Sequence, residues 1–329
     1  MKQSPAERPD PTLQRKAAII HGGVVDHAGH VRVVPQKNFD INRTIFQTLE
    51  GAIPRFVMTR RIAKDVHFDA SKAEQIREKY DATRAQVELP KVDPELVQFL
   101  INECDFDVEH AEGSFLDHLY FGYEYCVQHY PGHSPIVMLL HSILGTGTNT
   151  FAMPASKIPQ LKALITDEEW RQVEAFPSTL RLLYDGKLRE ELHKNAHRAR
   201  DIKEIHCHRV IDNEKIVLSG EDFWKQMNYQ IMHVIDFLPA ANWVAHHSDN
   251  SFILFRDMYD IMTKSGTLEA RVEYTPANGP HAFEGEDVDL AGRLLSRVPD
   301  IVVDKMAAKS VRRFSASIGH SLDYRIVWA

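Results

Sequence analysis

The residues best suited to chemistry in this chain are its histidines, of which the 329-residue sequence contains 18. Histidine is the commonest metal ligand and exchanges protons near neutral pH. His118 lies in an amphipathic segment, and His141 follows it at the end of the apolar run IVMLLH. His233 and Asp236 are three residues apart in a predicted long helix, so they share one face of it. Imidazoles with a carboxylate suit Mn, Fe, Zn or Co, which polarise a substrate oxygen, lower the pKa of bound water or activate dioxygen.

His118 and His141 belong to a longer motif, DHLYFGYEYCVQHYPGHSPIVMLLHSILGTGTNT. The motif resembles the first two metal-binding helices of the HD metal-hydrolase superfamily, in which a histidine on one helix meets a His-Asp pair on the next. The later segments ALITDEEWRQVEAFPSTLRLLYDG and FLPAANWVAHHS are similar to the hydrolase domain of guanosine tetraphosphate synthetase/hydrolase enzymes and to related uncharacterised families. The resemblance covers roughly residues 93–250 and implies an all-helical domain whose ligands converge on a divalent metal.

The resemblance also implies which positions hold the metal, and several of these are altered. The His-Asp pair is His141-Ser142 here, and the aspartate that supplies the last ligand corresponds to Asn242. A serine hydroxyl is a weaker ligand for a hard cation than a carboxylate, whereas Asn ligates through its carbonyl oxygen without adding charge. The Glu-Asp that follows the pair in the hydrolases is Gly145-Thr146, and the lysine that follows it in HD-type oxygenases is absent.

We therefore predict a rebuilt site for a divalent metal, with Fe, Mn or Zn as the candidates. Its predicted ligands are His118, His141, His233 and Asn242. Asp236 would complete the ligand set or act as a base, and Ser142 would be a nucleophile only with a base beside it.

Each of these residues also has a structural interpretation. His118 and His141 can be hydrogen-bonded core histidines, and His233 with Asp236 can be a buried or an exposed pair. His110, just ahead of the helix that carries His118, is a possible replacement ligand.

Three further features have both a functional and a structural interpretation. His206 and His208 would share one face of a strand, although a surface segment is the simpler interpretation. The GTGTNT loop after His141 either binds an anion through its backbone or is a plain loop near a pocket. His246-His247 suit the C-terminal end of a helix, where a positive charge is favourable.

Composition limits the classes of partner. The net charge of −7 and the pI near 6.2 disfavour a nucleic-acid binder. The three scattered cysteines argue against a disulfide framework or a thiolate zinc site. The sequence has no signal-peptide core and no apolar run of about 20 residues. We expect a cytoplasmic protein with a small-molecule substrate, no nucleic-acid or membrane partner, and a homodimer as one option for its assembly.

The hydrophobic periodicity predicts a mainly α fold, an HD-like helical bundle with two extensions. Residues 1–92 are expected to hold a leader, a β-hairpin (17–25 with 31–34) and helices at 40–66 and 71–86. Residues 93–250 form the HD-like domain, and residues 251–329 form a C-terminal helical extension packed on the core. Further helices are predicted at 94–103, 112–130, 134–144, 156–165, 167–180, 221–247, 252–264, 287–297 and 303–317, with a short β-excursion at 209–220 and a strand-like tail at 324–328. Asp93, Thr166 in a capping box with Glu169, and Ser219 are predicted to cap the helices that follow them, and Pro239 is expected to kink the helix at 221–247. The charged segment 187–205 is expected to be solvated.

Two classes of function fit this pattern. The first is an enzyme that acts on a small molecule at a modified HD-type metal site, with hydrolase or oxygenase chemistry. The second is a degenerate, metal-free HD fold that binds a ligand or a protein. A metal-free enzyme that uses the pocket histidines for acid–base catalysis lies between the two.

Overall fold

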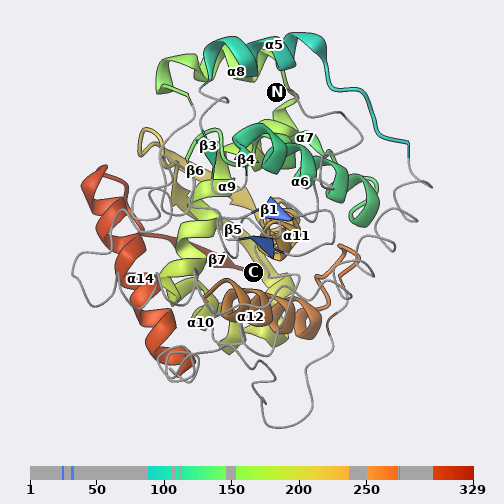
Figure 1. Cartoon of the computed structure of the whole chain (residues 1–329). Helices are drawn as coiled ribbons and strands as arrows, with labels where there is room; N and C mark the ends of the chain where they lie inside the picture. Colours follow the sequence, from blue (N-terminus) through green and yellow to red (C-terminus); the bar gives the residue numbers. More distant parts are fainter. Residues whose placement is uncertain are drawn as a thin grey trace.

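The computed structural model describes residues 88–104, 113–145, 153–236, 250–272, 274 and 299–329, together with short strands at 24–25, 31–32 and 109–110. This part of the chain is mainly helical (Figure 1). The predicted helices at 40–66, 71–86 and 287–297 lie outside the described residues. So do Pro239, His246-His247 and the GTGTNT loop beyond Gly145.

Two short β-ladders lie in the N-terminal part of the described chain. β1 (Val24–Val25) pairs antiparallel with β2 (Val31–Arg32), within the stretch where the hairpin was predicted. β3 (Glu109–His110) pairs antiparallel with β4 (Gly113–Ser114), so His110 lies in a short strand just ahead of the helix that carries His118.

The first group of helices follows the sequence prediction closely. α5 (Pro94–Glu103) begins where Asp93 accepts a hydrogen bond from the backbone N–H of Glu95 at 2.8 Å, with proline at the first helical position. α6 (Phe115–His129) is followed by the buried α7 (Ile136–Leu140), which is shorter than predicted because residues 141–144 form turns. A 3-10 turn at Ala155–Lys157 leads into α8 (Ile158–Ala163).

α9 (Asp167–Asp185) has the capping box that its sequence predicted. Thr166 Oγ1 accepts from the N–H of Glu169 at 3.2 Å, and the Glu169 carboxylate accepts from the N–H of Thr166 at 2.7 Å. The helix runs five residues beyond the predicted end at Leu180, and stops at Gly186, whose φ of 88° suits glycine.

A three-stranded antiparallel sheet lies in the second half of the chain, in the order β6-β5-β7. β6 (Lys215–Ser219) lies within the predicted β-excursion, and β7 (Arg325–Trp328) is the predicted C-terminal strand. Their shared partner β5 (Ile202–His208) precedes the predicted excursion and was not predicted as a strand. The charged segment before β5 forms α10 (Lys187–Lys194) and a 3-10 helix at Ala196–Asp201. It is not simply solvated, because the buried Arg189 pairs with Asp257 and Asp304.

α11 (Gly220–Asp236) follows β6 without a loop. Ser219 Oγ accepts from the N–H of Asp222 at 3.0 Å, which confirms the predicted cap. Glycine is required at position 220, because a Cβ there would lie 1.8 Å from the carbonyl oxygen of Ile202. α12 (Asn250–Ser265) and α14 (Asp300–Ser317) complete the described helices.

The buried side chains form two apolar clusters. One joins α5, α8 and the start of α9, and the other joins the end of α9, α10, the sheet, α11 and α12. α6, α7 and α9 contribute to both, and Figure 1 shows α5 with α8 and α10 with α12 at opposite ends of the molecule. The point where the clusters meet is therefore deep inside the protein. No helix within the described ranges is long and apolar enough to cross a membrane.

Candidate functional site

Two of the predicted metal ligands meet at the junction of the apolar clusters. The ring centroids of His141 and His233 lie 4.5 Å apart, with an interplanar angle of 59°. His141 follows α7 directly, and His233 lies in the last turn of α11, so the tertiary fold brings two distant segments together. Both side chains are buried. The pairing that the sequence left open is therefore present in the structure.

Phe176 of α9 forms an aromatic wall beside both histidines. Its ring centroid is 5.0 Å from that of His141 and 5.3 Å from that of His233, and it stands perpendicular to the His233 ring. Phe176 is 1 % exposed. An apolar wall of this kind lowers the local polarity and strengthens electrostatic interactions at the two imidazoles.

The His141 ring is oriented by the backbone of its own helix. Nδ1 lies 2.6 Å from the carbonyl oxygen of Met138. A carbonyl oxygen can only accept, so Nδ1 carries the proton, and the unprotonated nitrogen of the neutral ring is Nε2. A histidine whose other N–H is held by a carbonyl is the usual arrangement of a metal ligand. It also suits a proton acceptor.

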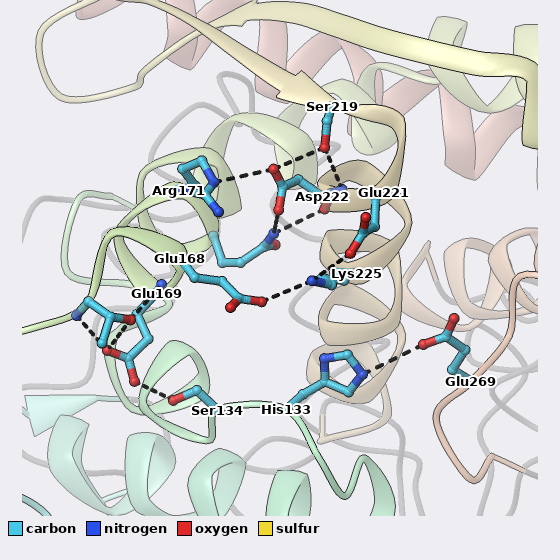
Figure 2. A network of polar contacts seen from close by, with 12 residues as sticks. His133, Ser134, Glu168, Glu169, Arg171, Ser219, Glu221, Asp222, Lys225 and Glu269 are labelled. Carbon is cyan, nitrogen blue, oxygen red and sulfur yellow. Dashed lines mark hydrogen bonds and ion pairs between the residues drawn. The ribbon is translucent and has the colours of Figure 1, made fainter.

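Polar contacts between the first turns of α9 and α11 set the register of these helices (Figure 2). Asp222 accepts hydrogen bonds from Arg171 Nε at 3.2 Å and from Gln172 Nε2 at 3.3 Å. Lys225 bonds Glu168 at 2.9 Å and also pairs with Glu221. These contacts join the first two turns of α9 to the first two turns of α11 and so fix how the two helices pack.

Gln230 continues this register toward the histidine pair. Its Nε2 donates to the carbonyl oxygen of Phe176 at 2.8 Å, and the side chain is wholly buried. His233 lies three residues further along α11 and contacts the Phe176 ring. Pro177 follows Phe176 and has no N–H, so the helix loses one of its own hydrogen bonds beside the site. The missing bond is the one to the carbonyl oxygen of Val173. Separately, the Phe176 carbonyl oxygen connects α9 to α11 one turn before His233.

α6 and α7 pack closely in the same region. A Cβ at Gly122 would lie 3.1 Å from Cε of Met138 and 3.5 Å from its carbonyl oxygen, the acceptor for His141. His118 lies one helical turn before Gly122 in α6, and its side chain lies outside the description. The backbone therefore places His118 on the helix that adjoins the His141 segment.

The remaining predicted site residues are placed as follows. Ser142 is buried in the turn after His141, and its carbonyl oxygen accepts from the N–H of Gly145. Asp236 is the last residue of α11, with its side chain outside the description, and Asn242 lies outside the described residues altogether.

The IHCH histidines lie in β5, as a strand interpretation requires. The His206 side chain is 33 % exposed and pairs with Glu204 at 2.8 Å. The carbonyl oxygen of His208 accepts from Ser178 Oγ at 2.5 Å and from His320 Nε2 at 2.9 Å. β5 is the central strand of the sheet, so the two histidines lie in a paired strand and not in the surface segment that the sequence favoured.

The imidazoles of His141 and His233 could supply two of the ligands that a divalent ion requires. Two imidazoles bound to one ion at about 2.1 Å have centroids roughly 4.5 to 5.2 Å apart, and the observed separation lies in this range. Among the residues that the structure describes, no three His, Cys, Asp or Glu side chains gather as a metal-binding group. A complete ligand set therefore needs His118, Asp236 or Asn242 in addition to the pair.

Sequence reasoning missed Phe176 and Gln230. Both look like ordinary core positions in the sequence, and only their approach to the histidines gives them a role. One signal was available, because a proline at 177 inside a well-capped helix marks a break in its hydrogen bonding. No family model matches this chain, and no curated protein and no solved structure matches it either.

Proposed function

We propose that the chain is an enzyme that acts on a small molecule at a modified HD-type site for one divalent metal ion. The observation that carries the proposal is the buried pair His141 and His233, with ring centroids 4.5 Å apart and the His141 ring held through Nδ1. Fe, Mn or Zn is the ion that this donor set suits best. His118, Asp236 and Asn242 are the candidates for completing the set.

A single ion is favoured over a pair. The superfamily's bridging aspartate corresponds to Ser142, which is buried beside His141 but has no charge to share between two cations. When bound, the ion supplies a Lewis acid, an activated water or a dioxygen-binding centre. The chain's own contribution is to hold two buried imidazoles and, at Phe176, to exclude water from one side of them.

Bound metal tests the proposal directly. The untagged wild-type chain, His141→Gln, His233→Gln and the control His206→Gln are purified, and their metal content is measured after incubation with Fe(II), Mn(II) or Zn(II). We expect about one ion per chain in the wild type and in the control, and at least about tenfold lower occupancy in the other two, because each removes a ligand. Circular dichroism verifies that every variant is folded.

Two results contradict this proposal: a wild type that remains metal-free, or a folded His141→Gln that keeps a stoichiometric ion. If the wild type binds metal and His141→Gln does not, the substitutions His118→Gln, Asp236→Asn and Asn242→Ala identify the remaining ligands. Zn or Mn directs the search for substrates toward hydrolysis, and Fe directs it toward oxidation. Ser142→Ala is expected to leave metal content unchanged, since the hydroxyl is not needed as a ligand.

A metal-free function is the second candidate, and the replacement of the superfamily's two aspartates by Ser142 and Asn242 favours it. Two buried imidazoles in contact can exchange a proton with a substrate, or simply form part of a binding pocket. Turnover that is insensitive to chelators and depends on pH would identify acid–base catalysis. Ligand binding without turnover would identify a degenerate HD fold that serves as a binding module.

A further inference from the structure

The outward face of α14 carries an unusual combination of side chains. Its exposed cations are Lys305, Lys309, Arg312 and Arg313, spaced at i, i+4, i+7 and i+8 so that they follow one side of the helix. Ile301 is 62 % exposed and Val302 is 42 % exposed at the start of the same helix. Of the large apolar side chains that the structure describes, only Val217 is exposed to a similar degree. We call this set of six residues the α14 face.

The acidic residues of α14 do not neutralise this face. Asp300 pairs with Arg256 at 2.7 Å, and Asp304 pairs with Arg189, on the side of the helix that packs on the protein. Arg312 contacts Asp185 through Nε, but its side chain is still 52 % exposed. The α14 face is therefore locally cationic in a chain whose net charge is −7.

We propose that the α14 face binds an anionic lipid surface and attaches the protein reversibly to a membrane. A row of cations beside exposed aliphatic side chains is the composition of interfacial helices, in which the cations attract anionic headgroups and the apolar residues enter the boundary layer. The proposal is independent of the metal site and adds a partner that the absence of a spanning segment did not suggest.

The shape of the surface favours a membrane over other anionic partners. α14 lies at the periphery of the molecule (Figure 1). A single outer helix is convex, which suits a flat lipid surface, whereas acidic peptides bind best in grooves. Ile301 and Val302 have no use on a phosphate backbone, but they gain free energy when they enter lipid. The negative charge elsewhere is screened beyond about 8 Å at physiological salt, so the local cations dominate close approach.

Vesicle binding of the full-length chain tests the proposal. Sedimentation is measured with phosphatidylcholine vesicles that contain about one third phosphatidylserine, and with phosphatidylcholine alone. We expect binding to the anionic vesicles only, and its loss at high salt. Lys305→Gln/Lys309→Gln should lower the partition coefficient about 25-fold, since each lysine near such a surface contributes about fivefold. Ile301→Ser should lower it about tenfold, because its apolar side chain no longer enters the lipid.

The matched control is Lys203→Gln/Lys215→Gln, which removes two exposed charges from the sheet and should bind as the wild type does. Equal weakening by the control and by Lys305→Gln/Lys309→Gln overturns the proposal, because it would mean that binding depends on total charge. Equal binding to vesicles without phosphatidylserine also overturns it. The proposal is also overturned if the protein does not bind vesicles but is retained on polyglutamate or duplex DNA. That result would assign the α14 face to an acidic protein or a nucleic acid.

Discussion

Among the described residues, buried histidines lie in two regions that differ in what surrounds the rings. His141 and His233 face each other across α7 and α11, against an aromatic wall. His320 lies between α14 and β7, where both ring nitrogens contact protein atoms: Nδ1 lies 3.4 Å from Ser315 Oγ and Nε2 lies 2.9 Å from the carbonyl oxygen of His208. In the first region two imidazole rings contact each other, whereas in the second the His320 ring contacts a side chain of α14 and the backbone of β5.

The cluster around His320 is accordingly structural. Arg181 Nη1 donates to Ser315 Oγ at 3.3 Å, and its guanidinium lies 4.7 Å from the centroid of the Phe314 ring. Burial lowers the pKa of Arg181 to about 9 and that of His320 to about 4. A chain of hydrogen bonds from Arg181 through Ser315 to His320 thus joins α9, α14 and the end of β5. The comparison teaches that burial alone does not make a histidine a functional candidate.

The largest effects should come from the aromatic residue in each region. Phe176→Ala and Phe314→Ala each remove a buried ring, and each should lower the free energy of unfolding by about 3 to 5 kcal/mol. The milder Phe176→Leu and Phe314→Leu separate the two regions. Only Phe176→Leu should change the metal affinity and the NMR shifts of His141 and His233. If Phe314→Leu changes them equally, the regions are not independent.

A pH-dependent effect of intermediate size should come from His320. Burial keeps this ring neutral in the folded state, whereas in the unfolded chain its pKa is near 6.5. Its contribution is therefore complete above about pH 6.5 and is lost as the pH falls toward about 4, by up to about 3 kcal/mol. Urea unfolding of the wild type and of His320→Gln at several pH values measures the difference. A wild-type slope that persists unchanged in the variant would assign the pH dependence to other groups.

The smallest effect should come from the cap of α9, which carries Phe176. Thr166→Ala removes one hydrogen bond of the capping box and should lower the free energy of unfolding by about 1 kcal/mol. Metal content and the histidine NMR shifts should not change, because the contacts of Gln172, Lys225 and Gln230 still hold the register of α9 and α11. Loss of bound metal in this variant would mean that the first turn of α9 positions the histidines directly.

Local sequence signals were sufficient for much of the fold. Asp93, Thr166 and Ser219 cap helices at the predicted places, because a cap is a contact between residues two or three positions apart. The strands at 215–219 and 325–328 agree with the short β-rich runs of the sequence, whereas the strand at 202–208 was not predicted. The end of α9 and the buried part of the segment 187–201 were missed, since packing against neighbouring helices decided both.

The sequence by itself determined that the protein is mainly helical, where several helices begin, and which histidines deserved attention. Only the tertiary structure decided that His141 meets His233, that Phe176 stands beside them, and that His320 connects α14 to β5. The physical reason is the range of the interactions. Capping and periodicity depend on residues within one or two turns, whereas the meeting of rings depends on how whole helices pack and in which register, which no local pattern encodes.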